Sequence, residues 1–154
     1  MKLQWKKLIL CIAVPLGVGG LSALLTRDGM EVFKTIDKPP LTPPDWVFPV
    51  VWSVLYVLMG TASYLVLTSG GEYRPALTVY GLQLAVNFFW SLFFFNLGWY
   101  LFSFVWLILL LVLIILTMVK FSRLSGPAAL LLLPYLLWAA FAGYLNLGVY
   151  LLNR

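Results

Sequence analysis

The chain has 154 residues, of which 63% are hydrophobic and 10% are charged, and its formal net charge is +5. Its mean hydropathy of +1.01 is well above that of soluble globular domains, so the chain could not stay dispersed in water. One cysteine and no histidine exclude an intrachain disulfide and a Cys/His metal site, and no predicted helix carries a basic stripe. We therefore expect a membrane protein with no metal, no cofactor and no nucleic-acid partner.

Charged and turn-forming residues divide the chain into five hydrophobic stretches, each close to the ~20 residues that a helix needs to cross a bilayer. They are predicted at residues 8–25, 47–68, 75–96, 99–119 and 127–152. Residues 75–119 contain no charged side chain, and a polar break near their middle indicates two crossings joined by a tight turn. The sequence thus predicts an all-α integral membrane protein, a five-transmembrane-helix bundle forming a single domain over 1–154, with a Pro-rich loop over 26–46.

The basic residues outside these spans indicate an orientation. Four lie on the side of the Pro-rich loop, and six lie on the N-terminal side: Lys2, Lys6, Lys7, Arg74, Lys120 and Arg123. The positive-inside rule favours a cytoplasmic N-terminus and places the Pro-rich loop outside. The first stretch is predicted to be a retained span rather than a signal peptide, because Pro15 and several glycines interrupt it.

The Pro-rich loop is the longest connection between spans. Residues 37–46 contain four prolines, and each proline fixes φ and favours extended or polyproline backbone. Two interpretations stay open at this point: a stiff flap over one mouth of the bundle, or a linker that starts the second span.

No span carries an acidic, basic or histidine residue in its central part, which argues against a proton relay and ion-driven transport. Three spans instead carry aromatic faces with one or two amides, at helical spacing. These faces contain Trp52, Tyr56, Met59 and Ser63; Tyr80, Gln83, Asn87, Trp90 and Phe94; and Tyr135, Trp138, Ala142, Leu145, Asn146 and Val149. Such faces suit a flat apolar ligand.

Structural roles for these residues also stay open. Amides in membrane helices often bond to a neighbouring helix, and tryptophans near span ends are typical of headgroup anchors. The anchor role fits Trp5, Trp46, Trp99 and Trp106 better than Trp90 and Trp138, which lie several residues inside their spans.

Several motifs, in chain order, resemble the translocator protein family, whose members are also called tryptophan-rich sensory proteins or peripheral benzodiazepine receptors. The first motifs are Pro15-x-x-x-Gly19-Gly20, Lys38-Pro39, Pro43-Pro44-x-Trp46-Val47-Phe48-Pro49-Val50-Val51-Trp52 and Leu55-Tyr56-x-x-Met59-Gly60. They are followed by Gln83-Leu84-x-x-Asn87-x-x-Trp90 and by Pro134-Tyr135-x-x-Trp138-x-x-Phe141-Ala142-x-x-Leu145-Asn146. The resemblance covers nearly the whole chain.

The resemblance implies a multi-pass protein of a bacterial cell membrane, commonly a homodimer, whose partners are the lipid bilayer and protoporphyrin IX or a similar flat apolar ligand. Animal members also bind cholesterol and isoquinoline or benzodiazepine ligands. Carried over by motif position, the pocket would draw on Trp52, Asn87, Trp90, Trp138, Ala142 and Leu145. The chain has Val32-Phe33 where the family often has an aromatic pair, so one stacking group is expected to be missing.

The function implied by this resemblance is that of a membrane receptor or sensor for tetrapyrroles. Two alternatives stay open: an enzyme that degrades porphyrin in light, with Trp52 and Trp138 as the reactive residues, and a passive carrier of tetrapyrrole or lipid. The segment from Leu147 to Arg154 also fits a permissive sterol-recognition pattern.

Overall fold

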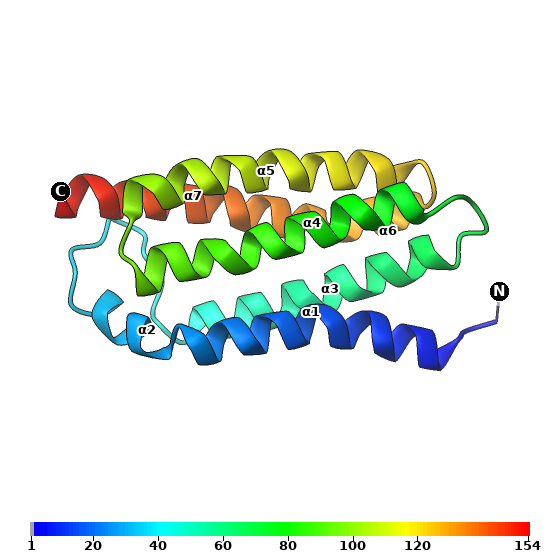
Figure 1. The fold of residues 1–154 in the computed structure, drawn as a ribbon, viewed down its shortest axis with the longest axis horizontal. Coiled ribbons are helices and arrows are strands. Elements are labelled where there is room, and N and C mark those ends of the chain that lie inside the picture. Colours follow the sequence, from blue (N-terminus) through cyan, green and yellow to red (C-terminus); the bar gives the residue numbers. More distant parts are fainter. Residues whose placement is uncertain (1) are drawn as a thin grey trace.

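The structure is a computed structural model, and it describes residues 2–154. Within this range, five helical segments are long and apolar enough to cross a membrane, and they lie side by side (Figure 1). They are α1 (Trp5–Leu25), α3 (Val47–Leu67), α4 (Arg74–Ser91) with the π-helical turn η1 (Leu92–Asn96), α5 (Tyr100–Ser122), and α6 (Gly126–Leu131) with α7 (Leu133–Asn153). The predicted five-helix all-α bundle is confirmed.

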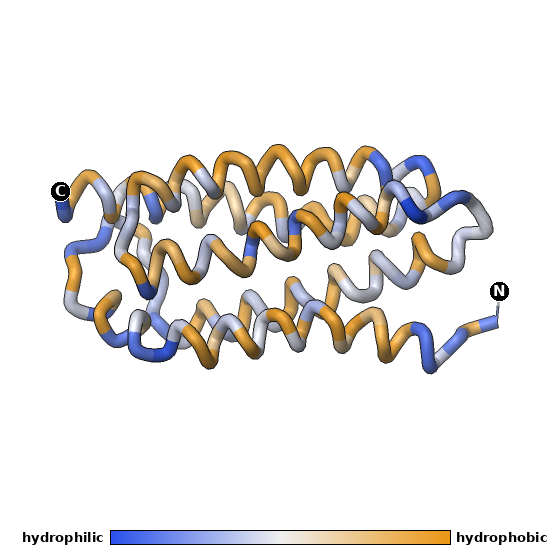
Figure 2. The backbone as a smooth tube through the Cα atoms, viewed as in Figure 1, coloured by the Kyte–Doolittle hydropathy of each residue, from blue (hydrophilic) through white to orange (hydrophobic). Residues whose placement is uncertain are grey.

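Polar residues gather at the two ends of the bundle, and the N- and C-termini lie at opposite ends (Figures 1 and 2). Local signals explain several helix ends. Pro75 and Pro127 lie in the first turns of α4 and α6, where a missing N–H costs little. The Ser125 hydroxyl caps α6 by accepting the N–H of Ala128 at 3.3 Å. Gly98, with φ of +64°, makes the turn between η1 and α5.

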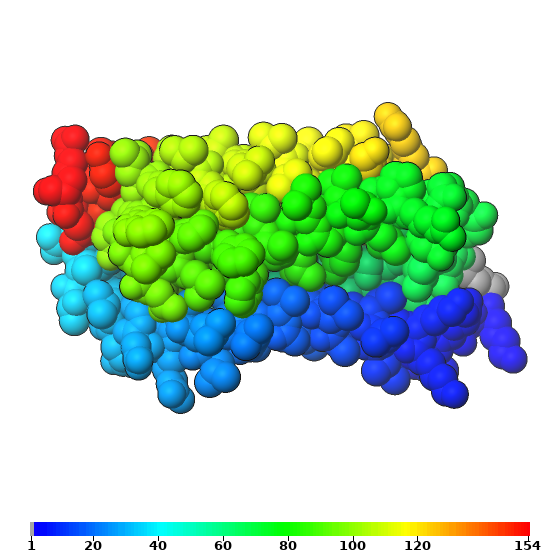
Figure 3. All heavy atoms as spheres, viewed as in Figure 1, coloured from blue at the N-terminus to red at the C-terminus, as the bar shows by residue number. Residues whose placement is uncertain are grey.

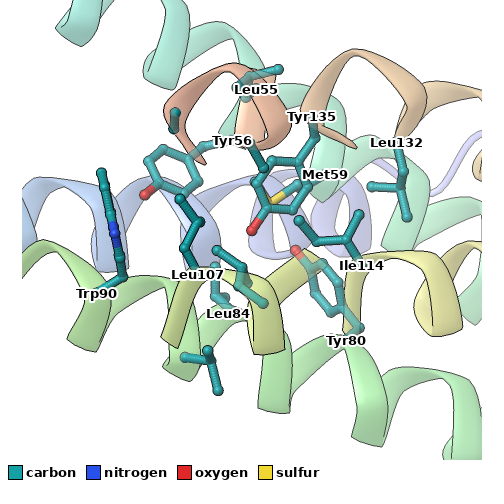
Figure 4. Packing of buried hydrophobic residues seen from close by; sticks show 14 of the residues in the cluster. Leu55, Tyr56, Met59, Tyr80, Leu84, Trp90, Leu107, Ile114, Leu132 and Tyr135 are labelled. Carbon is teal, nitrogen blue, oxygen red and sulfur yellow. The ribbon is translucent and has the colours of Figure 1, made fainter. Parts of the chain in front are cut away.

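The core of the bundle lies between α3, α4, α5 and α7, and Figure 4 shows its buried side chains converging from these helices. α1 is attached at one edge, where the space-filling view shows it running along the bundle (Figure 3). Of its most apolar stretch 11% is buried, against 33–44% in the other four spans. α1 is therefore the span with the fewest packing constraints.

Close contact between α1 and α3 depends on two glycines. A side chain at Gly60 would overlap the backbone of Cys11 and Ile12, and one at Gly19 would overlap the ring of Tyr56. Each glycine lets a helix backbone approach its neighbour closely, as small residues do in membrane bundles.

The connection over 26–46 is more structured than expected. It begins with a short helix, α2 (Arg27–Phe33), in a stretch that contains no proline. The segment after α2 is tied to α7. The side chain of Asn153 accepts the N–H of Asp37 at 3.1 Å and donates to its carbonyl at 2.7 Å, and the Tyr144 hydroxyl donates to the carbonyl of Pro40 at 2.6 Å.

The tryptophans expected at the headgroups divide into two kinds. Trp5, Trp46 and Trp99 are 64%, 67% and 52% exposed, as interfacial anchors would be. Trp106 is half-buried instead, and its indole N–H donates to the carbonyl of Val86 at 2.7 Å. This bond joins α5 to α4, so Trp106 is a helix-packing residue, because its position on α5 turns its indole toward the neighbouring helix.

Candidate ligand cavity

A cavity of about 370 Å³ lies in the half of the bundle next to the connection over 26–46, which is within the ~300–1,000 Å³ range of small-molecule sites. Its wall is mostly apolar and comes from α1, α2, α3, the end of α4 with η1, and α7. The lining residues are Leu16, Gly19, Gly20, Ser22, Ala23, Thr26, Met30, Phe33, Phe48, Pro49, Trp52, Ser53, Tyr56, Trp90, Ser91, Phe94, Phe95, Trp138, Ala142, Leu145 and Asn146.

Three indoles from three different helices contribute to this wall. Trp52 on α3 stacks on Tyr56 with ring centroids 5.7 Å apart, and Trp90 on α4 stacks on Phe94 at 5.4 Å. Trp138 on α7 meets Phe48 edge-on at 6.0 Å. Rings held by their neighbours in this way offer flat apolar faces at a low entropic cost, which suits a planar aromatic ligand.

The orientation of the Trp90 indole is held by a buried amide. Its N–H donates to Oδ1 of Asn146 at 2.9 Å, and Nδ2 of Asn146 donates to the carbonyl of Tyr100 at 2.7 Å. Asn146 is fully buried and so links α4, α7 and the start of α5. Because both polar ends of Asn146 are satisfied, the Trp90 ring is fixed as part of the cavity wall.

A second buried network joins α4 to α7 outside the cavity wall. Nδ2 of Asn87 donates to the Tyr135 hydroxyl at 3.0 Å, and that hydroxyl donates to Oε1 of Gln83 at 2.7 Å. Figure 4 shows Tyr135 among the core residues of this region. Oδ1 of Asn87 and Nε2 of Gln83 have no partner among residues 2–154. Both amides therefore act as links between helices here.

Replacing Tyr135 by phenylalanine should destabilise the bundle by about 1–2 kcal/mol, because the amide donor of Asn87 and the amide acceptor of Gln83 would lose their partner in an apolar interior. Thermal unfolding in nanodiscs measures this loss. Tyr144→Phe is the matched control, since it removes one exposed bond to Pro40 and should cost clearly less. Equal melting temperatures for the two variants would contradict the buried network.

The structure brings together five of the six residues expected in the pocket. Trp52, Trp90, Trp138, Ala142 and Leu145 all line the cavity, whereas Asn87 does not. Asn87 points its amide at Tyr135, and the amide that reaches the lining is that of Asn146, one of the residues on the aromatic face of the last span.

Sequence reasoning missed most of the contribution of α1 and α2. Gly19 and Gly20 belong to a family motif but were not among the residues expected in the pocket, and Met30 and Phe33 belong to a helix that was not predicted. Phe33 lines the cavity and is 4% exposed, while its neighbour Val32 is 55% exposed. One aromatic ring of the expected pair is thus present. The sequence signal for a contribution from α1 was the pair Gly19-Gly20, about one helical turn after Pro15, because glycines leave that part of the helix surface without side chains.

Comparison with known proteins agrees with the motifs and the fold. The sequence model of the TspO/MBR family matches residues 11–152. The chain belongs to the TspO/MBR family. As a member of the TspO/MBR family with five candidate spans, it is a multi-pass membrane protein.

Individual relatives cover almost the whole length. The chain is 41% identical to the tryptophan-rich protein TspO of Chlorobaculum tepidum over 157 residues, which covers 99% of each chain. It is 33% identical to the tryptophan-rich sensory protein of Cereibacter sphaeroides, over 99% of this chain and 95% of the relative. It is 39% identical to the translocator protein of Bos taurus, over 83% of this chain and 79% of the relative. The resemblance to the translocator protein family that was stated from the motifs is confirmed.

Proposed function

We propose that the protein is a membrane receptor or sensor that binds protoporphyrin IX and related tetrapyrroles in the cavity. The observation that carries this proposal is the convergence of Trp52, Trp90 and Trp138, from three helices, on one apolar cavity within the membrane-spanning region. A tetrapyrrole is planar, aromatic and larger than any one ring, so it gains most from several stacking faces in a single site. The isoquinoline and benzodiazepine ligands that the family resemblance implies also carry flat aromatic rings.

Protoporphyrin IX titration in the dark tests the proposal. Protein in nanodiscs should show saturable quenching of tryptophan fluorescence, because the ligand would lie against the three indoles. A planar isoquinoline should compete for the same site. Quenching that rises linearly, as in empty nanodiscs, would contradict a specific cavity.

Light-dependent breakdown of the bound porphyrin, with dissolved dioxygen as the oxidant, is a second candidate function. It is favoured by the readily oxidised indoles in the wall of the same cavity, of which Trp52 and Trp138 are the proposed reactive residues. Illumination after the dark titration separates the two functions. A receptor leaves the porphyrin spectrum as stable as in empty nanodiscs, whereas an enzyme causes decay that depends on the protein.

We also propose that the protein lies in a bacterial cell membrane with its N-terminus in the cytoplasm, on the basis of the six-to-four excess of basic residues on that side. In a Cys11→Ala background, Thr35→Cys should react with an impermeant maleimide added to intact cells, since Thr35 is exposed beyond α2. Ser122→Cys, exposed at the other end, should react only after lysis. The reverse labelling pattern would invert the orientation.

A further inference from the structure

The residues that line the cavity differ in how far they are exposed at the protein surface. Of these lining residues most are buried or half-buried, and five are exposed. All five exposed residues lie on α1 or α3: Leu16, Gly20, Ala23, Pro49 and Ser53. The residues contributed by α4 and α7 are buried or half-buried without exception. The cavity is therefore least protected between α1 and α3, on a surface that faces lipid.

α1 and α3 contact each other closely at one level of the bundle and separate at the next. They are in closest contact where Gly60 meets Ile12 and where Gly19 meets Tyr56. The same face of α3 continues toward the connection over 26–46 as Ser53 and Pro49, because residues three or four apart share a helix face. Both of these residues are exposed, so α1 no longer covers α3 there.

Gly20 borders this separation. A Cβ atom built on Gly20 would have no other atom within 4 Å, although the residue lines the cavity. The opening is thus bordered on the α1 side by a residue with no side chain and by the small Ala23.

The end of the cavity nearest the aqueous phase is closed by comparison. Phe33 of α2 packs edge-on against Phe48 with ring centroids 6.0 Å apart, and Phe33 is 4% exposed. α2 is itself held in place, because Gly29 lies against the backbone of Phe95. The end of α1 just before it is tied to η1, since the Asn96 side chain donates to the carbonyl of Leu25 at 2.9 Å. The lid over this end is α2, and the proline-containing segment lies against α7.

A second groove does not reach the cavity directly. It is apolar, lies between α3 and α7, and includes Val54 and Leu137. Trp138 contributes to both the groove and the cavity, so its indole forms a partition between them. A ligand entering the cavity from this groove would have to displace the packed indole of Trp138.

We propose that ligands enter and leave the cavity sideways from the bilayer, through the opening between α1 and α3. Ala23 lies two residues before the end of α1 and Pro49 two residues after the start of α3, so the opening begins ~3 Å inside the helix ends at 1.5 Å per residue. We place this level near the headgroups, because the exposed Trp46 immediately precedes α3. It suits a planar amphiphile whose polar edge stays at the headgroups while its rings lie among the acyl chains.

This inference rests on the proposed function, and binding kinetics test it. Protein is reconstituted in liposomes and mixed with liposomes that carry protoporphyrin IX, and tryptophan quenching is followed in time. Gly20→Leu should place a side chain in the opening and slow both association and dissociation by about tenfold, with a dissociation constant changed much less. Gly17→Leu is the matched control: it also has open space around its Cβ, but it does not line the cavity and should leave both rates unchanged.

Ser53→Leu narrows the opening from the α3 side and decides the question if Gly20→Leu does not fold. An unchanged association rate in the folded variants would overturn the proposal, even if affinity fell, because the new side chain would then only intrude into the cavity. Faster association in Tyr144→Phe, which frees the segment at Pro40 from α7, would also overturn it in favour of access from water. Failure of the proposed receptor function can be distinguished from failure of the proposed entry route, since the parent protein would then show no saturable quenching.

Discussion

Ala142→Phe is expected to weaken protoporphyrin IX binding by about 10- to 100-fold while leaving the bundle folded. Ala142 is 6% exposed and lies on the cavity wall of α7. A benzyl group there would extend into the cavity of about 370 Å³ and take the space of a flat ligand. Overfilling a site costs typically ~1–3 kcal/mol, and each ~1.4 kcal/mol is a tenfold loss of affinity.

The measurement is the dark quenching titration, combined with thermal unfolding in nanodiscs. Ala140→Phe is the matched control, because Ala140 is on the same helix, is exposed and does not line the cavity. It should bind like the parent protein. Equal affinity in Ala142→Phe and Ala140→Phe, with normal melting of both, would show that the cavity is not the binding site.

Trp52→Phe and Trp138→Phe are expected to reduce light-dependent porphyrin loss to near the rate in protein-free nanodiscs, if the protein is an enzyme. Both indoles line the cavity, and phenylalanine retains a stacking face while lacking the easily oxidised indole. Dark affinity should therefore be largely kept. No acid–base pair or metal-ligand set is predicted from the sequence, so the electron-rich indoles Trp52 and Trp138 are the predicted reactive groups.

The measurement is the decay of the porphyrin absorption band under constant illumination, at saturating protein. Trp46→Phe is the control, since Trp46 is 67% exposed and lies outside the cavity lining, and it should decay like the parent. If Trp52→Phe and Trp138→Phe both bind normally and bleach the porphyrin as fast as the parent, the bleaching is incidental and the protein is a receptor.

The number and approximate places of the five spans could be predicted from the sequence, because the need to bury about twenty consecutive residues in lipid acts locally along the chain. The aromatic faces carrying Trp52, Trp90 and Trp138 could also be predicted, since helical spacing alone places residues on one face. The motifs indicated the protein family, and the comparisons confirm it.

Which amide lines the cavity could not be predicted in this way. Asn87 and Asn146 each lie on an aromatic helix face, and their sequence surroundings do not distinguish them. The packing of α4 against α7 decides that Asn87 bonds to Tyr135, while Asn146 holds the indole of Trp90. This outcome depends on how far each helix is rotated about its axis, which is set by contacts with other helices.

The sequence by itself determined that this protein folds in lipid as five helices with aromatic faces, since hydropathy, length and period are properties of each segment alone. Only the tertiary structure decided where those faces enclose a cavity and where that cavity is open. Gly60 and Gly19 bring α1 and α3 together at one level, and the two helices then separate at Gly20 and Ser53. A separation between helices arises from the crossing of two segments distant in the chain, so no single segment carries the information.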